Sequence, residues 1–257
     1  MLHLQFGIQK PMSTKSTNGF PPTRKLIIAS TSTVYGGEYL DYLSEEMAEL
    51  FKDSEEIIFI PYARPGGISH DEYTEKAAKA FQKIGKRLVG LHTFKNPAEA
   101  LKNAKGAFTG GGNTFVLVNE LYRLQLMQPL REAIFNGLPY MGTSAGSNIC
   151  GVSMQTTNDM PIVYPPSFKT LGVIPFNLNP HYLDPEPNSK HMGETRETRI
   201  AEFHTQNTIP VVGLREGSWL RVHGDEIILK GKLKARVFEK GKEANEVETG
   251  TILNSEF

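Results

Sequence analysis

The chain has 257 residues, enough to bury one substantial hydrophobic core, and we expect residues 25–257 to fold as one domain. Lysine plus arginine and aspartate plus glutamate both total 28, so no net charge points to nucleic acid or an anionic membrane as a partner. The one cysteine, Cys150, excludes an internal disulfide and fits a reducing compartment. The apolar runs are far shorter than the roughly 20 residues that span a bilayer, so we expect a cytoplasmic protein.

The first 24 residues differ in composition from the rest of the chain. They contain several serines, threonines and prolines, and the first acidic residue of the chain is Glu38. We expect a flexible extension over residues 1–24, or a chain that begins at Met12. An organellar transit peptide is the alternative, but no arginine precedes Arg24 and the apolar residues form no helical stripe.

From residue 25 onward, short apolar runs alternate with segments of helical periodicity. Ser69 and Glu72 stand at the spacing of a capping box, which predicts where one helix begins. This alternation predicts an α/β fold with a mostly parallel sheet, helices on both faces, and functional groups at the carboxyl ends of the strands. We expect strands at 25–31, 55–61, 86–92, 106–109 and 138–142, and helices at 38–52, 69–84, 98–104, 115–124 and 129–135.

The last third of the chain has a different pattern. Short β-rich runs at 211–215, 219–222, 226–229 and 235–238 are separated by turn residues such as glycine. This spacing predicts antiparallel hairpins at an edge of the sheet.

Gly142-Thr143-Ser144-Ala145-Gly146 fits the Gly-x-Ser-x-Gly elbow, a sharp turn between a strand and a helix that exposes a serine hydroxyl. The small flanking residues leave room for the strained turn. The five-residue pattern is weak evidence alone, but it follows an apolar strand and precedes a run that can start a helix. We therefore predict that Ser144 is a nucleophile.

A glycine-rich segment, Gly110-Gly111-Gly112-Asn113, ends the strand that precedes the elbow strand. Amides without side chains can approach a substrate oxygen closely, so this segment, with the Ala145 amide, is a candidate oxyanion hole. A phosphate-binding loop is disfavoured because neither Gly-x-Gly-x-x-Gly nor Gly-Lys-Ser/Thr is present. An ordinary flexible turn stays open as an alternative.

A nucleophilic serine needs a base, and four histidines follow Ser144 in the chain. His181 lies in the irregular segment Asn179-Pro180-His181-Tyr182 after a short apolar run, the kind of place where a sheet collects catalytic side chains. His191, in a polar loop, is the weaker rival; we expect His204 to end a charged helix and His223 to lie in a surface turn. A metal site formed by His181, Asp184 and His191 lacks any familiar ligand spacing.

The acid that orients the base has several candidates. Glu216 follows an apolar strand, where a carboxylate without a partner is costly. An ion pair with a neighbouring arginine would explain it equally well. Asp159, Asp184 and Glu186 therefore stay open as alternatives.

Taken together, these segments resemble the peptidase E family of aspartyl dipeptidases, serine peptidases with a class I glutamine-amidotransferase-like fold. The match extends from about residue 25 almost to the carboxyl terminus, and several motifs occur in the right order. They are Gly110–Thr114, Gly142–Gly146, Thr157–Ile162, Asn179–His181, Gly193–Arg196 and Arg215–Gly217.

The resemblance implies a catalytic triad of Ser144, His181 and Glu216, with the Gly112 and Ala145 amides as the oxyanion hole. It implies hydrolysis of dipeptides that begin with aspartate, through an acyl-enzyme, without a metal or organic cofactor. The related amidotransferases use cysteine as nucleophile. Here Ser144 holds that position, and we expect Cys150 to be a small core residue.

A preference for aspartate requires a cation that recognises a carboxylate, and arginine does so bidentately. On a helix starting near Gly193, Arg196 has no acidic neighbour at three or four residues, whereas Arg199 has Glu202. We predict Arg196 as the first choice for binding the substrate and Arg199 as the second. Asn113 and Thr195 are weaker candidates.

Two other classes of function stay open. One is a different serine hydrolase on this fold, such as a cyanophycinase-like or acyl-ester enzyme. The other is a non-catalytic module that binds small molecules and keeps the elbow. The sequence does not predict the oligomeric state.

Overall fold

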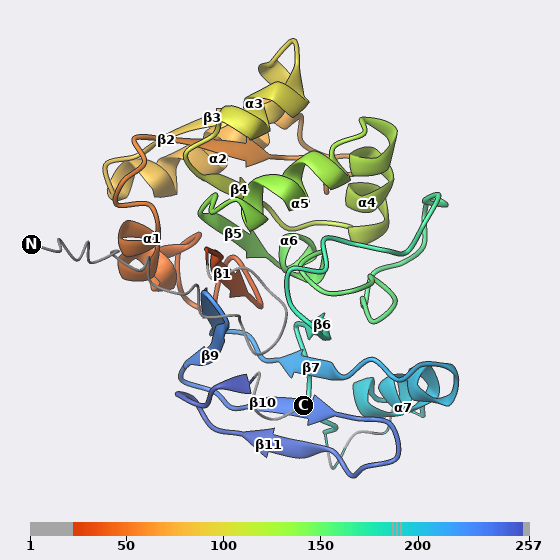
Figure 1. The fold of residues 1–257 in the computed structure, drawn as a ribbon. Helices are drawn as coiled ribbons and strands as arrows, with labels where there is room; N and C mark the ends of the chain where they lie inside the picture. Colours follow the sequence, from red (N-terminus) through yellow and green to blue (C-terminus); the bar gives the residue numbers. More distant parts are fainter. Residues whose placement is uncertain (1–22, 187, 189, 191, 254–257) are drawn as a thin grey trace, which may run out of the picture.

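The structure, a computed structural model, describes residues 23–186, 188, 190 and 192–253 (Figure 1). Its main sheet has seven strands in the order β3-β2-β4-β5-β1-β8-β9. The five strands from β3 to β1 are parallel, and β8 and β9 extend the sheet in antiparallel fashion. The strands are β1 (Lys25–Ala29), β2 (Glu56–Ile60), β3 (Arg87–Gly90), β4 (Ala107–Thr109), β5 (Tyr140–Thr143), β8 (Ser218–His223) and β9 (Glu226–Gly231).

Helices cover both faces of this sheet, as expected. Leu26 and Ile28 of β1 face one hydrophobic cluster with side chains of α3, α4 and α5, while Ile27 and Ala29 face the other with side chains of α1 and α2. This period of two buries a strand on both sides, as in other parallel sheets. The helices are α1 (Ser44–Leu50), α2 (His70–Lys83), α3 (Pro97–Asn103), α4 (Thr114–Arg123), α5 (Met127–Phe135) and α6 (Ala145–Asn148).

The capping box at the start of α2 is confirmed. The Ser69 hydroxyl accepts a hydrogen bond from the Glu72 amide, and the Glu72 carboxylate accepts one from the Ser69 amide. The expected helix at 38–52 begins later than predicted. Leu40 has a left-handed conformation (φ 60°), and a 3-10 turn, Asp41–Leu43, precedes α1.

The expectation that the late strands form hairpins at one sheet edge is only half right. β8 and β9 do so, but four strands form a second sheet in the order β11-β10-β7-β6. Within it β6 and β7 are parallel, and β10 is antiparallel to both β7 and β11. These strands are β6 (Asn177–Pro180), β7 (Val211–Leu214), β10 (Ala235–Phe238) and β11 (Asn245–Val247), of which the sequence predicted neither β6 nor β11.

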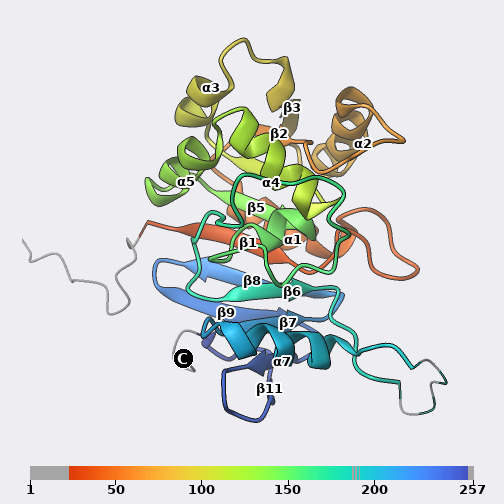
Figure 2. The same cartoon turned by 90° about the vertical axis from the view of Figure 1, so that its right-hand side faces the viewer.

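The second sheet lies below the parallel strands of the main sheet in the view of Figure 2, with α7 (Arg196–Gln206) against it. Ile200 of α7 packs with Tyr182, Val211 and Phe238 in a small cluster. The main hydrophobic cluster also includes Leu178 and other side chains of the second sheet, so the two sheets share a core.

The amino-terminal boundary needs a correction. Of the expected extension, residues 1–22 lie outside the described residues, but Arg24 is 1% exposed. Its guanidinium donates to the Val173 carbonyl, and its own carbonyl accepts a hydrogen bond from the Gly224 amide. The folded chain therefore begins before residue 25. None of the described helices is both long enough and apolar enough to span a membrane.

Candidate active site

Ser144 lies at a strained turn between β5 and α6, as the elbow pattern predicts. Its backbone has φ 54° and ψ −111°, outside the regions that side chains favour. A Cβ on Gly142 would come within 2.3 Å of the Gly146 carbonyl oxygen, and one on Gly146 within 2.2 Å of the Thr109 carbonyl oxygen. Only glycine fits at these two positions.

His181 connects Ser144 with Glu216. Its Nε2 lies 3.0 Å from the Ser144 Oγ, and its Nδ1 lies 2.6 Å from the Glu216 Oε1. An imidazole that carries its proton on Nδ1 donates to the carboxylate and can accept the serine proton on Nε2. The structure thus brings together the three residues that the sequence singled out.

Parallel pairing of β6 with β7 explains how residues 35 positions apart meet. Pro180 is paired with Leu214 at the carboxyl ends of these strands, just before His181 and Arg215-Glu216. His181 turns away from its strand with φ 54°, and Gly217 reverses the chain after Glu216 with φ 84°. The His181 and Glu216 side chains therefore lie at the carboxyl ends of β6 and β7, on the side of Ser144.

Sequence reasoning missed a buried contact that ties the base to the acid. The Ser30 hydroxyl, directly after β1, accepts a hydrogen bond from the His181 amide (2.9 Å) and donates one to the Leu214 carbonyl (2.6 Å). Ser30 is fully buried. One side chain of the main sheet thus fixes the backbone on both strands that carry the base and the acid.

The glycine-rich segment of the candidate oxyanion hole follows β4 and lies beside Ser144. A Cβ on Gly111 would lie 2.9 Å from the Ser144 Cβ, whereas one on Gly112 would clash with the Ala63 carbonyl oxygen at 2.2 Å. Gly112 has φ 147°, which favours glycine. The Ala145 amide is the first of α6, so no carbonyl within the helix can accept its hydrogen bond.

The other candidate acids have different partners. Asp159 accepts hydrogen bonds from the Thr114 amide (2.7 Å) and the Thr157 hydroxyl (3.1 Å). Asp184 pairs with Arg215 through two hydrogen bonds of 2.6 and 2.8 Å. Glu186 is exposed. Among the described residues, only Glu216 contacts the imidazole of His181 through a carboxylate.

The rival histidines also lie elsewhere. His204 is buried on α7 and its Nε2 lies 3.0 Å from the Ile209 carbonyl oxygen, while His223 ends β8 at the surface. His191 lies outside the described residues. Within the described part of the chain, no three histidine, cysteine, aspartate or glutamate side chains gather as a metal site. Cys150 is buried just after α6, and burial raises the pKa of its thiol.

Arg196 begins α7 and is half-buried. Burial, followed by repulsion from Arg199, lowers its pKa, and the nearby Asp159 carboxylate partly offsets both. Arg199 is more exposed and pairs at 3.8 Å with Glu194, not with the Glu202 that the sequence suggested. Within the described residues, Arg196 forms no ion pair, so its charge is available to a ligand.

The two weaker candidates for substrate contacts cap helices. Asn113 is the N-cap of α4: its side chain accepts a hydrogen bond from the Val116 amide (3.1 Å) and donates one to the Met160 carbonyl (2.9 Å). Thr195 is the N-cap of α7 and accepts a hydrogen bond from the Thr198 amide at 3.0 Å. These bonds account for both side chains without a substrate.

Comparison with known proteins identifies the family. Residues 26–230 match the model of peptidase family S51. The chain is 46% identical over 229 residues to a peptidase E of Streptomyces coelicolor, covering 89% of this chain and 93% of that protein. It is likewise 46% identical over 219 residues to a probable alpha-aspartyl dipeptidase of Drosophila melanogaster, covering 84% and 90%.

Solved structures support the fold. A putative peptidase E from Listeria monocytogenes aligns with a TM-score of 0.62 and 22% identity, over 81% of this chain and 98% of that one. A peptidase from an acI-B1 actinobacterium aligns with a TM-score of 0.67 and 19% identity, over 89% and 96%. The match to the family model and the identity to its relatives lead to one conclusion: the chain belongs to peptidase family S51, a family of serine peptidases.

Proposed function

We propose that this serine peptidase hydrolyses dipeptides that begin with aspartate, with Ser144 as nucleophile, His181 as base and Glu216 as orienting acid. The observation that carries the proposal is the position of His181, within hydrogen-bonding distance of both Ser144 and Glu216. The substrate class is that of the relative named as a probable alpha-aspartyl dipeptidase. We further propose that the folded chain acts as one peptidase domain in the cytoplasm.

The reaction follows from the order of these contacts. His181 takes the Ser144 proton on Nε2 while the serine oxygen attacks the peptide carbonyl carbon. When the tetrahedral intermediate collapses, the imidazolium gives that proton to the leaving amine and an aspartyl ester of Ser144 forms. A water molecule, deprotonated by His181, then attacks the ester and releases aspartate. Glu216 holds the Nδ1 proton throughout and stabilises the imidazolium.

The oxyanion of each tetrahedral intermediate needs donors that are already in place. The Ala145 amide at the start of α6 is one such donor, and the Gly112 amide of the glycine segment is our candidate for the second. The close packing of Gly111 against Ser144 supports this assignment, because it leaves no side chain between the segment and the nucleophile.

Arg196 is our candidate for the aspartate side chain of the substrate. It is half-buried, and no described residue forms an ion pair with it. It lies near Asp159, whose carboxylate accepts a hydrogen bond from the Thr114 amide at the start of α4, just after the glycine-rich segment. A planar guanidinium binds a carboxylate through two parallel hydrogen bonds. Arg199 is the second candidate, and Asn113 and Thr195 are weaker ones because each already caps a helix.

A substrate panel tests the proposal. The purified protein is assayed with Asp-Leu, Asn-Leu, Ala-Leu and a simple acyl ester, and is labelled with a fluorophosphonate, which reacts only with an activated hydroxyl. We expect labelling at Ser144 and, among these substrates, cleavage of Asp-Leu alone. In Ser144→Ala we expect no labelling and a turnover of Asp-Leu that is lower by a factor of about 10⁶. Labelling with cleavage of the ester or Ala-Leu instead would indicate another serine hydrolase, such as a cyanophycinase-like enzyme. No labelling would indicate a binding module.

A further inference from the structure

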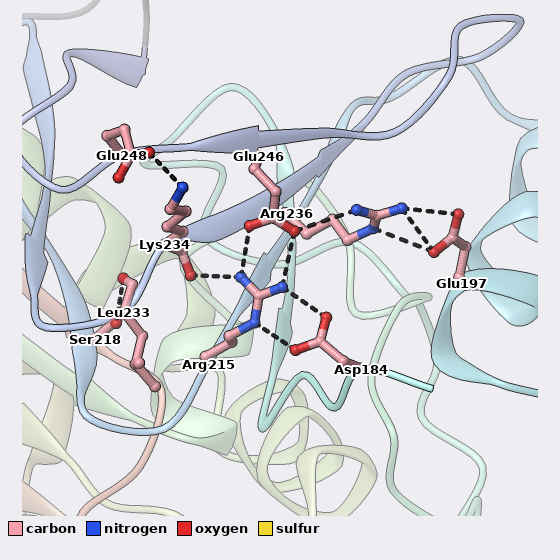
Figure 3. A network of polar contacts seen from close by, with 9 residues as sticks. All are labelled: Asp184, Glu197, Arg215, Ser218, Leu233, Lys234, Arg236, Glu246 and Glu248. Carbon is pink, nitrogen blue, oxygen red and sulfur yellow. Dashed lines mark hydrogen bonds and ion pairs between the residues drawn. The ribbon is translucent and has the colours of Figure 1, made fainter. Parts of the chain in front are cut away.

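Arg215, the residue before Glu216, lies at the centre of a network of charged side chains (Figure 3). Its Nε and Nη2 donate to the two oxygens of Asp184, and its Nη1 and Nη2 donate to the two oxygens of Glu246. Its remaining donor bonds the Lys234 carbonyl at 2.8 Å. A guanidinium has five N–H donors, and here all five are used.

The network extends to the helix that carries the candidate substrate arginine. Glu246 also pairs with Arg236 at 3.2 Å, and Arg236 pairs with Glu197 at 3.0 Å in the first turn of α7. Figure 3 shows Glu246 between the two arginines. Two guanidinium groups and three carboxylates thus join β7, β10, β11, α7 and the segment that follows β6.

These contacts make Arg215 unavailable to its neighbour in sequence, Glu216. The Arg215 side chain is 14% exposed and its guanidinium pairs with Asp184 and Glu246, so the Glu216 carboxylate keeps His181 as its partner. The ion pair between neighbours that the sequence left open is therefore not formed. The Arg215 side chain points to Asp184 and Glu246, whereas the side chain of the next residue, Glu216, points to His181.

The candidate base and acid need such support because burial does not hold them. The His181 and Glu216 side chains are 39% and 48% exposed. His181 also has an unfavourable backbone conformation, which persists only when neighbouring contacts impose it. Arg215 contacts two of the three residues that follow His181: its guanidinium lies 5.5 Å from the centre of the Tyr182 ring and bonds Asp184 bidentately.

We propose that Arg215 is a positioning residue for the reaction: through Asp184 and Tyr182 it fixes the segment that carries His181, and through its own backbone it fixes Glu216. The proposal rests on the roles assigned to His181 and Glu216 under the proposed function. A misplacement of about 1 Å between catalytic groups can lower turnover by about 10². A loss of Arg215 should therefore appear in the chemical step.

The variant Arg215→Lys tests this role while keeping the positive charge. An ammonium group is a compact charge with three donors and cannot grip two carboxylates bidentately. We expect the rate of fluorophosphonate labelling of Ser144 and kcat for Asp-Leu to fall together by about 10- to 100-fold, with KM within about threefold. Asp184→Asn should change the same two rates in the same direction by a smaller factor.

Arg123→Lys is the matched control. Arg123 grips Glu120 through three hydrogen bonds, but this pair lies at the end of α4 and the Arg123 side chain is 61% exposed. We expect labelling, kcat and KM within twofold of the parent. The midpoint of thermal unfolding is measured for every variant. A midpoint above the assay temperature shows that the variant is folded during the kinetic measurement.

Two results would overturn the proposal. One is Arg215→Lys with a lower unfolding midpoint but parental labelling and kcat, which would make the network purely structural. The other is a rise in KM with unchanged kcat. A failure of the proposed function is distinguishable, because a parent enzyme that is labelled but does not cleave Asp-Leu leaves the labelling arm valid as a test of Arg215.

Discussion

At the scale of single residues, the Glu216 carboxylate offers the most direct test of the proposed triad. Glu216→Gln keeps the shape of the side chain but lets a neutral amide stabilise the wrong imidazole tautomer. We expect turnover of Asp-Leu to fall by about 10³- to 10⁴-fold while circular dichroism stays parental. Near-parental turnover would show that Glu216 is not the orienting acid, and Asp159→Asn would then be the next variant to assay.

Arg196 can be tested through selectivity instead of overall rate. An arginine that is partly desolvated costs free energy when a substrate leaves it unpaired, so Asp-Leu should exceed Asn-Leu by at least about 10² in kcat/KM. In Arg196→Ala we expect this ratio to approach one, mainly because cleavage of Asp-Leu slows. Arg199→Ala is the control from the same helix and should keep the ratio. A ratio that survives in Arg196→Ala and collapses in Arg199→Ala would exchange the two roles.

At the scale of elements, Ser30 links the main sheet to the second sheet through two hydrogen bonds of its hydroxyl. Ser30→Ala leaves the His181 amide without its hydroxyl partner, whereas the Leu214 carbonyl still accepts a hydrogen bond from the Tyr182 amide at 3.2 Å. One unsatisfied buried group costs about 1–3 kcal/mol. We expect a lower unfolding midpoint and, because the backbone of the base can then shift, a kcat reduced about tenfold with little change in KM.

A buried serine at the other end of the strands serves as the control for Ser30. Ser54 is 2% exposed and donates to the Lys105 carbonyl, ahead of β2 and far along the sheet from the candidate site. Ser54→Ala should lower the unfolding midpoint while kcat stays parental. Equal losses of kcat in the two variants would mean that Ser30 acts only through general stability.

The elements that the sequence predicted are those with local signals. Apolar runs of four or five residues mark the parallel strands, and the capping box marks α2. β6 was missed because Asn177, Asn179 and Pro180 are unlike strand residues; it forms because β7, more than 30 residues later, pairs with it. Tertiary contact outweighs propensity there.

The candidate site shows the same division between local and distant information. Ser144 is recognisable from five adjacent residues. The contact of Ser30 with His181 spans 151 residues, and that of Arg215 with Asp184 spans 31. No spacing in the sequence indicates which side chains such pairs use, because the pairing depends on how the second sheet packs against the first.

At the scale of the whole molecule, the charged network makes stability depend on pH. Hydrogen bonds from Arg215 lower the pKa of Asp184 and of Glu246 below their ordinary values of 3.8 and 4.5. The unfolded chain therefore binds more protons than the folded one in acid, and the stabilisation, complete above these ordinary values, is lost as pH falls through the lowered pKa values.

We expect the free energy of unfolding, measured in urea, to decline as pH falls below about 4.5. Glu246→Gln removes one of the titrating carboxylates, so its stability should be lower at pH 7 and should decline less steeply in acid. A decline with the same slope in the variant and the parent would show that Glu246 contributes nothing to the acid sensitivity.

The backbone of Ser144 has a consequence for how this protein responds to selection. A serine with φ 54° and ψ −111° stores strain of about 1–3 kcal/mol, which glycine would relieve. Heat resistance and activity therefore favour different residues at position 144. A library of random variants screened only for survival at high temperature should enrich glycine there and yield robust proteins without activity, so thermostabilisation of this enzyme requires a catalytic screen at every round.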